Sequence, residues 1–158
     1  MTKQDWDQVS AIYQEGIDTN NATFETEVPS QGQWFADHIL ECSIVAEEKS
    51  NILGWASLSK VSARCVYEGV GEVSVYVCKA NQGRGIGNSL LAELIKLSEQ
   101  QGFWTLQSSI LAENEASINL HVKHGFRVVG RRERISKLNG DWRDLIVMER
   151  RSTVVGTD

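Results

Sequence analysis

The spacing of apolar residues predicts four helices. In the first, apolar side chains recur every three or four positions behind a possible cap at Asp5, and a possible cap at Ser30 precedes the second. The third and fourth keep one apolar face and stop at Gly102 and Gly125, since glycine commonly ends a helix. The predicted helices cover residues 5–17, 34–40, 86–101 and 113–124.

Runs rich in β-branched and aromatic residues predict six strands between and after these helices. They cover residues 43–48, 52–61, 72–79, 103–111, 126–138 and 141–150. The turn Lys49–Asn51 joins the first two as a hairpin, and Asn139-Gly140 joins the last two. The order α-α-β-β-β-α-β-α-β-β predicts one α/β domain over residues 1–150, with helices layered on a mixed sheet, and a frayed tail over residues 151–158.

Composition narrows the possible partners. The chain has 158 residues, 41% of them hydrophobic, which is the size and content of one ordinary domain. A formal charge of −5 and a pI near 5.3 argue against a nucleic-acid surface, which normally needs a basic stripe. No segment approaches the length of unbroken apolar sequence that a membrane helix needs, so we expect no membrane partner and a cytoplasmic location. Three cysteines without a CxxC spacing indicate neither a disulfide framework nor a zinc site.

The stretch "GRGIG", Gly83 to Gly87, joins a predicted strand to a predicted helix. Free backbone N–H groups and the helix dipole make such a turn suited to a phosphate or pyrophosphate. Asn88 excludes both a GxGxxG fingerprint from Gly83 and a Walker A loop, which require glycine or GK[ST] there. Taken alone, the turn is more often a plain strand-to-helix connection, because isolated glycine motifs are weak signals.

Two signatures in the expected order give the turn a more specific meaning. "QGRGIG" fits Q/R-x-x-G-x-G/A, and "NEASINLHVKHGF" is similar to N-x-x-S-x-x-L-Y-x-x-x-G-F, with His121 in place of the commoner tyrosine. Together they resemble the GCN5-related N-acetyltransferase (GNAT) superfamily. The resemblance implies a mixed, mostly antiparallel central sheet flanked by helices, and acetyl-CoA as cosubstrate.

The rest of the chain resembles the phosphinothricin and methionine sulfoximine N-acetyltransferase subfamily. Supporting segments are "TFETE" before the proline loop, the R-x-x-Y pattern from Arg64 to Tyr67, the glutamate of "EVSVYV" and the closing "GDWRDL". Two features depart from the subfamily. Val70-Gly71 precede the glutamate, and the chain starts almost at the first helix, which leaves a first strand shortened or absent.

The resemblance implies where the coenzyme binds. Its pyrophosphate would lie on the turn and the start of the helix, its pantetheine arm along the backbone of the third strand, and two further contacts would come from the fourth helix. The implied coenzyme-binding residues are Val75, Tyr76, Val77, Gln82, Gly83, Arg84, Gly85, Ile86, Gly87, Asn88, Asn114 and Ser117.

The resemblance also implies catalytic and acceptor residues. Glu72 would be the base that deprotonates the acceptor amine, and His121 would protonate or stabilise the leaving thiolate. Arg64 and Tyr67 would clamp the acceptor's carboxylate, because guanidinium binds a carboxylate bidentately. Phe24 and Glu25 would line the opposite wall. A pair of histidines at 121 and 124 has no clear further ligands, so no metal is expected.

The sequence therefore predicts an acetyl-CoA-dependent N-acetyltransferase that acts on a small amino acid or analogue by direct transfer. The subfamily resemblance implies a possible homodimer. Two alternatives stay open: an acetyltransferase for another amine, such as a polyamine, an antibiotic or a protein N-terminus, and a module that senses acyl-CoA without turnover.

Overall fold

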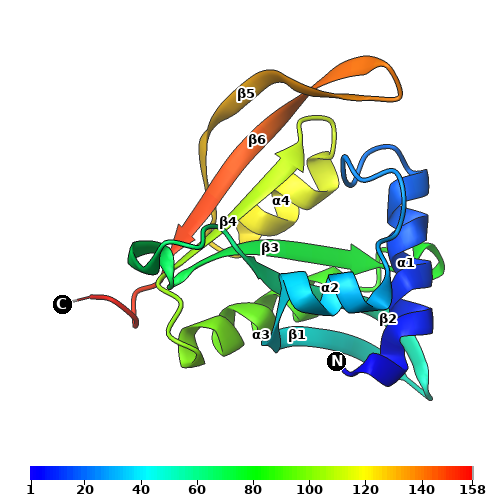
Figure 1. The fold of residues 1–158 in the computed structure, drawn as a ribbon, viewed down its shortest axis with the longest axis horizontal. Coiled ribbons are helices and arrows are strands. Elements are labelled where there is room, and N and C mark those ends of the chain that lie inside the picture. Colours follow the sequence, from blue (N-terminus) through cyan, green and yellow to red (C-terminus); the bar gives the residue numbers. More distant parts are fainter. Residues whose placement is uncertain (158) are drawn as a thin grey trace.

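The helices and strands follow one another in the order that the apolar pattern predicts. The computed structural model describes residues 1–157 (Figure 1). Its elements are α1 (Trp6–Asp18), α2 (Gln31–Asp37), β1 (His38–Glu48), β2 (Asn51–Lys60), β3 (Val70–Val77), α3 (Ile86–Gln100), β4 (Thr105–Leu111), α4 (Glu115–Lys123), β5 (Arg127–Leu138) and β6 (Asp141–Arg151). Short 3-10 turns lie at Lys3–Asp5 (η1), Cys65–Tyr67 (η2) and Lys79–Asn81 (η3). Within the described residues, α1 is preceded by the short turn η1.

The predicted bounds of the second helix and the start of the first strand are wrong. The helix was expected over residues 34–40 and the strand from Ser43, but α2 runs from Gln31 to Asp37 and β1 begins at His38. His38 and Ile39 pair with Ser59 and Leu58 of β2, so strand pairing overrides the local helical spacing. The predicted cap is confirmed, because the Ser30 side chain accepts a hydrogen bond from the N–H of Gln33.

The six strands form one mixed sheet in the order β1-β2-β3-β4-β6-β5. Every neighbouring pair is antiparallel except β3 with β4. The turns at Lys49-Ser50 and Asn139-Gly140 have positive φ at both positions, as two-residue hairpin turns require. The predicted mixed, mostly antiparallel sheet is confirmed.

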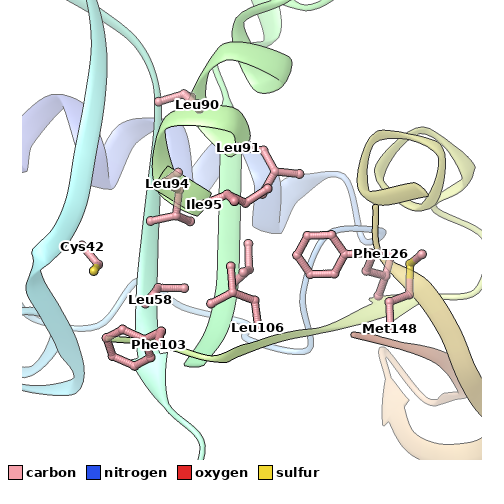
Figure 2. Close-up of a cluster of buried hydrophobic side chains, with 13 residues drawn as sticks. Cys42, Leu58, Leu90, Leu91, Leu94, Ile95, Phe103, Leu106, Phe126 and Met148 are labelled. Carbon is pink, nitrogen blue, oxygen red and sulfur yellow. The ribbon is translucent and has the colours of Figure 1, made fainter. Parts of the chain in front are cut away.

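Each face of the sheet has its own apolar cluster. On one face, α3 presents Leu91 and Leu94 to Leu58 of β2 and Leu106 of β4, with Phe126 and Met148 beside them (Figure 2). On the other face, α1 and α2 bury Val9, Ile12 and Trp34 against Ile52 and Trp55 of β2. Together these clusters fix both faces of β2 and β3, and β3 is the strand that carries the site.

The parallel strands β3 and β4 are paired over only three residues each. Val70 to Glu72 pair with Thr105 to Gln107, and beyond that point the two strands diverge (Figure 1). Meanwhile β3 remains paired with β2 as far as Val77. The edge of β3 from Ser74 to Val77 that faces away from β2 therefore has no strand partner.

The segment after β6 is held against the domain at its start. Ser152 is buried, its N–H donates to the Trp104 carbonyl, and its hydroxyl oxygen accepts from the N–H groups of Val154 and Val155. Arg151 donates to the carbonyls of Trp104 and Val155. Residues 151–155, which were expected to fray, are thus hydrogen bonded to the domain or to one another.

Among the described residues 1–157, no helix is long and apolar enough to cross a membrane. In the same part of the chain, no group of three or more His, Cys, Asp or Glu side chains is placed to hold a metal ion.

Candidate active site

A cleft of about 970 Å³ opens where β3 and β4 diverge. Its walls come from α1 and the loop after it, β3, the glycine turn with the start of α3, the end of β4, and α4. Fifteen of the eighteen predicted site residues line it: Phe24, Glu25, Glu72, Val75, Tyr76, Val77, Gln82, Gly83, Gly85, Ile86, Gly87, Asn88, Asn114, Ser117 and His121. The other three, Arg64, Tyr67 and Arg84, do not.

The glycine turn forms one end of the cleft. Gly83 and Gly85 have φ of 77° and 79°, a left-handed conformation that glycine adopts without steric cost. The first backbone bond of α3 runs from the Ser89 N–H to the Gly85 carbonyl at 3.1 Å. The N–H groups of Ile86, Gly87 and Asn88 therefore have no partner within the helix, and the positive end of a 15-residue helix dipole adds to them. This end of the cleft suits a pyrophosphate.

Arg84 does not turn its side chain into the cleft. Its guanidinium pairs with the exposed Glu48 carboxylate at 3.3 Å. Because both side chains are about half exposed, this pair contributes little to stability.

The unpaired edge of β3 forms the middle of the cleft. Val75 and Val77 pack toward the α3 cluster, while Tyr76 packs toward α1. Free N–H and C=O groups along an exposed strand edge can pair with an extended ligand as an added strand would. The amides of a pantetheine arm are such a ligand.

Glu72 lies at the point where β3 and β4 separate, and both of its carboxylate oxygens accept hydrogen bonds from β4. The Gln107 side-chain amide donates to Oε2, and the Ser109 N–H donates to Oε1 at 3.0 Å. No arginine, lysine or histidine pairs with Glu72 among residues 1–157. The carboxylate is thus held in place by neutral donors and faces the cleft.

His121 is 2% exposed and lines the cleft from α4. Its Nδ1 lies 2.8 Å from the Ser117 carbonyl, and because a carbonyl only accepts, Nδ1 is the nitrogen that carries the proton. Burial lowers the pKa of His121, which keeps the imidazole neutral near pH 7. Nε2 is then an unprotonated acceptor, and it is buried without a hydrogen-bond partner.

Asn114 has a structural role that the sequence motif did not indicate. Its Oδ1 caps α4 by accepting from the Ser117 N–H at 3.1 Å, and its Nδ2 donates to the Asn21 carbonyl at 2.9 Å. The side-chain amide expected to contact coenzyme thus joins α4 to the loop after α1.

Two tyrosine rings form an aromatic wall of the cleft, one from α1 and one from β3. Tyr13 and Tyr76 both line the cleft, with ring centroids 4.9 Å apart, next to Phe24 and Glu25. Burial raises the pKa of both tyrosines, and the nearby Glu25 carboxylate raises them further, so both hydroxyls stay protonated.

Sequence reasoning missed Tyr13 and Gln107. Tyr13 looked like an ordinary apolar position of the first helix. Gln107 lies on a strand that showed no motif, and only the register of β3 with β4 brings it to Glu72.

The expected carboxylate clamp is not formed within one chain. Tyr67 lies in η2, and Arg64 lies just before it. Both come before β3 in the chain, whereas the cleft opens beyond Glu72. They contact each other, with the Arg64 guanidinium 5.6 Å from the centre of the Tyr67 ring. Among the described residues that line the cleft, the charged side chains are those of Glu25 and Glu72, and no lysine or arginine is among them.

Known proteins share this architecture. A family model described as "Acetyltransferase (GNAT) domain" matches residues 1–147. A phosphinothricin N-acetyltransferase from Streptomyces viridochromogenes is 30% identical, over 91% of this chain and 81% of that protein. An L-methionine sulfoximine/L-methionine sulfone acetyltransferase from Pseudomonas paraeruginosa is 28% identical, over 89% and 86%.

A solved structure extends the agreement to three dimensions. The phosphinothricin acetyltransferase of Sinorhizobium meliloti, solved in complex with acetyl-CoA, superposes with a TM-score of 0.89 at 26% identity, over 100% of this chain and 89% of that one. The glycine turn and the free edge of β3 fit the same coenzyme. From the match over residues 1–147 and from these relatives, the chain belongs to the GNAT family of acetyl-CoA-dependent N-acetyltransferases.

Proposed function

We propose that the enzyme transfers the acetyl group of acetyl-CoA to the α-amine of a small amino acid or analogue of the phosphinothricin or methionine sulfoximine type. The observation that carries this proposal is the two-ended cleft between β3 and β4, with the glycine turn at one end and the Glu72 carboxylate at the other. Both reactants can be present together, so transfer is direct and needs no acyl-enzyme.

Two parts of the cleft would bind the coenzyme. The N–H groups from Gly83 to Asn88 would hold the pyrophosphate, and the edge of β3 from Val75 to Val77 would hold the pantetheine arm. Acetyl-CoA supplies an activated acetyl thioester when bound. An N–H group of the same β3 edge is suited to polarise its carbonyl.

Glu72 would take the proton from the acceptor amine. An α-amine has an unperturbed pKa of about 8, so much of it is protonated and unreactive at neutral pH. A carboxylate fixed by two donors, with lone pairs still free toward the cleft, can accept that proton directly or through one water.

The role of His121 depends on where its proton lies. With Nδ1–H donated to Ser117, Nε2 has no proton to give to a leaving thiolate. For His121 to act as the acid it must first take up a proton at Nε2. After the amine has attacked the thioester, its nitrogen carries a second proton besides the one that Glu72 takes, and this second proton is a source. We propose that His121 receives and returns a proton within one turnover.

Recognition of the acceptor's carboxylate would require a second copy of the chain. The cleft lining contains two glutamates and neither lysine nor arginine, while Arg64 and Tyr67 are exposed elsewhere on the surface. We propose a homodimer in which Arg64 and Tyr67 of one copy complete the cleft of the other.

The same observation favours a second candidate acceptor. If no second copy contributes a cation, an acidic, aromatic cleft suits an amine without a carboxylate, whose ammonium group would bind near Glu25 and the tyrosine rings.

An acceptor panel tests the proposal. Purified enzyme is given acetyl-CoA with phosphinothricin, methionine sulfoximine or methionine sulfone, and release of free thiol is followed. The matched control is the amine in which hydrogen replaces the carboxyl group of methionine sulfone. We expect the amino acids to accelerate release and the control amine to fail. Faster release with the control amine would favour the second candidate, and no acceleration by any amine would contradict N-acetyl transfer to small acceptors.

A further inference from the structure

Among the described residues, Gln107 supplies the side-chain hydrogen bond to Glu72. It stands on β4 directly in register with Glu72, at the last of the three positions where β3 and β4 are paired. Two residues further along β4, the Ser109 N–H reaches the other carboxylate oxygen. The two donors bracket the carboxylate at the point where the strands part.

The neighbours of Gln107 explain why its amide is directed to Glu72. In register across the sheet, Gln107 lies between Glu72 of β3 and Glu149 of β6, so it has a carboxylate on each side. Glu149 is already paired with Arg127 of β5. The Gln107 N–H therefore goes to Glu72, which has no cation of its own.

The other titratable groups around the cleft leave this arrangement undisturbed. Glu25 and Tyr13 line the cleft from the α1 side, Tyr76 from β3 and His121 from α4. None of them hydrogen bonds Glu72 within residues 1–157, and Ser59, its register partner on β2, is uncharged.

We propose that Gln107 is a positioning residue for the base. Its amide, together with the Ser109 N–H, fixes the rotamer of Glu72 and so holds the carboxylate at the cleft. Each oxygen keeps a lone pair that is free to accept the amine's proton. This inference rests on the proposed function, in which Glu72 is the base.

Two substitutions remove the donor in different ways. Gln107→Leu keeps the approximate volume, and Gln107→Glu keeps the shape but sets a second carboxylate against Glu72. With both substrates saturating, we expect Gln107→Leu to lower kcat by about tenfold to a hundredfold through misplacement of the base, with the KM for acetyl-CoA unchanged. Gln107→Glu should lower kcat as well, because its carboxylate has no N–H to donate to Glu72 and repels it.

A double-mutant cycle separates positioning from a merely structural role. If Gln107 acts through Glu72, adding Gln107→Leu to Glu72→Gln should cost almost nothing further in kcat. Gln101→Leu, the same chemical change on an exposed residue at the end of α3, is the matched control and should leave kcat and its pH profile as in the wild type.

The outcomes also separate this inference from the proposed function. If the wild type transfers acetyl groups but Gln107→Leu and Gln107→Glu both keep the wild-type kcat, the positioning role is overturned and the function stands. The positioning role is equally overturned if the two losses in kcat simply multiply in the double variant. If the wild type transfers to no amine, the proposed function itself fails.

Discussion

At the scale of single residues, the state of His121 is set by one backbone carbonyl. The Ser117 carbonyl accepts a hydrogen bond from Nδ1–H, and burial disfavours a second proton on the ring. The histidine is therefore a neutral hydrogen-bond acceptor at Nε2. A tyrosine in the same position would differ, because its hydroxyl carries a proton that it can donate.

The same burial predicts how stability depends on pH. Because the pKa of His121 is lowered in the folded state, the stabilisation linked to it is complete above the unfolded-state value of about 6.5 and is lost as pH falls below it. His38 and His124, whose pKa values are also lowered, add losses of the same sign. We expect His121→Gln to lose less unfolding free energy than the wild type between pH 7 and pH 5 in urea titrations, and an equal loss in both proteins would contradict this assignment.

Gly85 offers a second test at this scale. Its φ of 79° strains any residue with a Cβ, so Gly85→Ala should cost about 1 kcal/mol of unfolding free energy and weaken acetyl-CoA binding at the turn. Gly32→Ala is the matched control, since Gly32 lies in α2 with open space around it and ordinary φ, and alanine there should add up to about 1 kcal/mol. Thermal unfolding and calorimetric coenzyme binding would measure both, and equal effects of the two substitutions would contradict the strain argument.

At the scale of elements, the loop after α1 is tied to the far side of the cleft. Arg143 of β6 donates to the Asn20 carbonyl at 3.1 Å, to Asn21 Oδ1 at 3.4 Å and to Glu113 Oε2 at 3.0 Å. Asn114 holds the same loop from the start of α4. Because this loop continues into Phe24 and Glu25, these contacts set the acceptor wall of the cleft.

Loosening this anchor should affect the acceptor more than the coenzyme. Arg143→Lys keeps the charge but loses the forked geometry, so we expect the acceptor KM to rise about tenfold while the Kd for acetyl-CoA stays the same. Arg132→Lys, on the exposed face of β5, is the matched control and should change neither constant. Equal effects of the two substitutions on the acceptor KM would contradict the anchoring role.

Local pattern was enough to predict most elements but not how they meet. Helix spacing, alternation and turn residues predicted the ten elements in order, and the error at Leu40 came from strand pairing that acts across the sheet. The contact of Gln107 with Glu72 joins residues 35 positions apart and depends on the register of two strands, which no local pattern encodes. Motif spacing predicted the end of the cleft that would bind the coenzyme, because that end is built from consecutive residues.

At the scale of the whole molecule, the cleft lining within residues 1–157 lacks the cation that we propose for the acceptor's carboxylate. The sequence motif grouped Arg64 with Glu72 as parts of one site, but η2 lies ahead of β3 and Arg64 does not line the cleft. Sequence resemblance carries no information on which copy supplies a residue, and that is why the clamp could not be placed from the sequence.

Mixing two inactive variants tests the shared site. If Arg64 serves the neighbouring cleft, coexpressed Glu72→Gln and Arg64→Ala chains should form heterodimers with one intact cleft and recover about a quarter of the wild-type acetyl transfer, as random pairing in a two-fold dimer predicts. Each variant alone should stay near background. If the mixture recovers nothing although sizing shows a dimer, the clamp does not cross between copies.

The central claim is that Glu72 deprotonates the acceptor in a cleft that binds acetyl-CoA independently of it. The most direct measurement compares thiol release by the wild type and Glu72→Gln across pH, with acetyl-CoA affinity measured on the same preparations. The account predicts that Glu72→Gln lowers kcat by about a hundredfold or more, abolishes the acid limb and leaves the coenzyme Kd unchanged. A variant that turns over at the wild-type rate with the wild-type pH profile would contradict it.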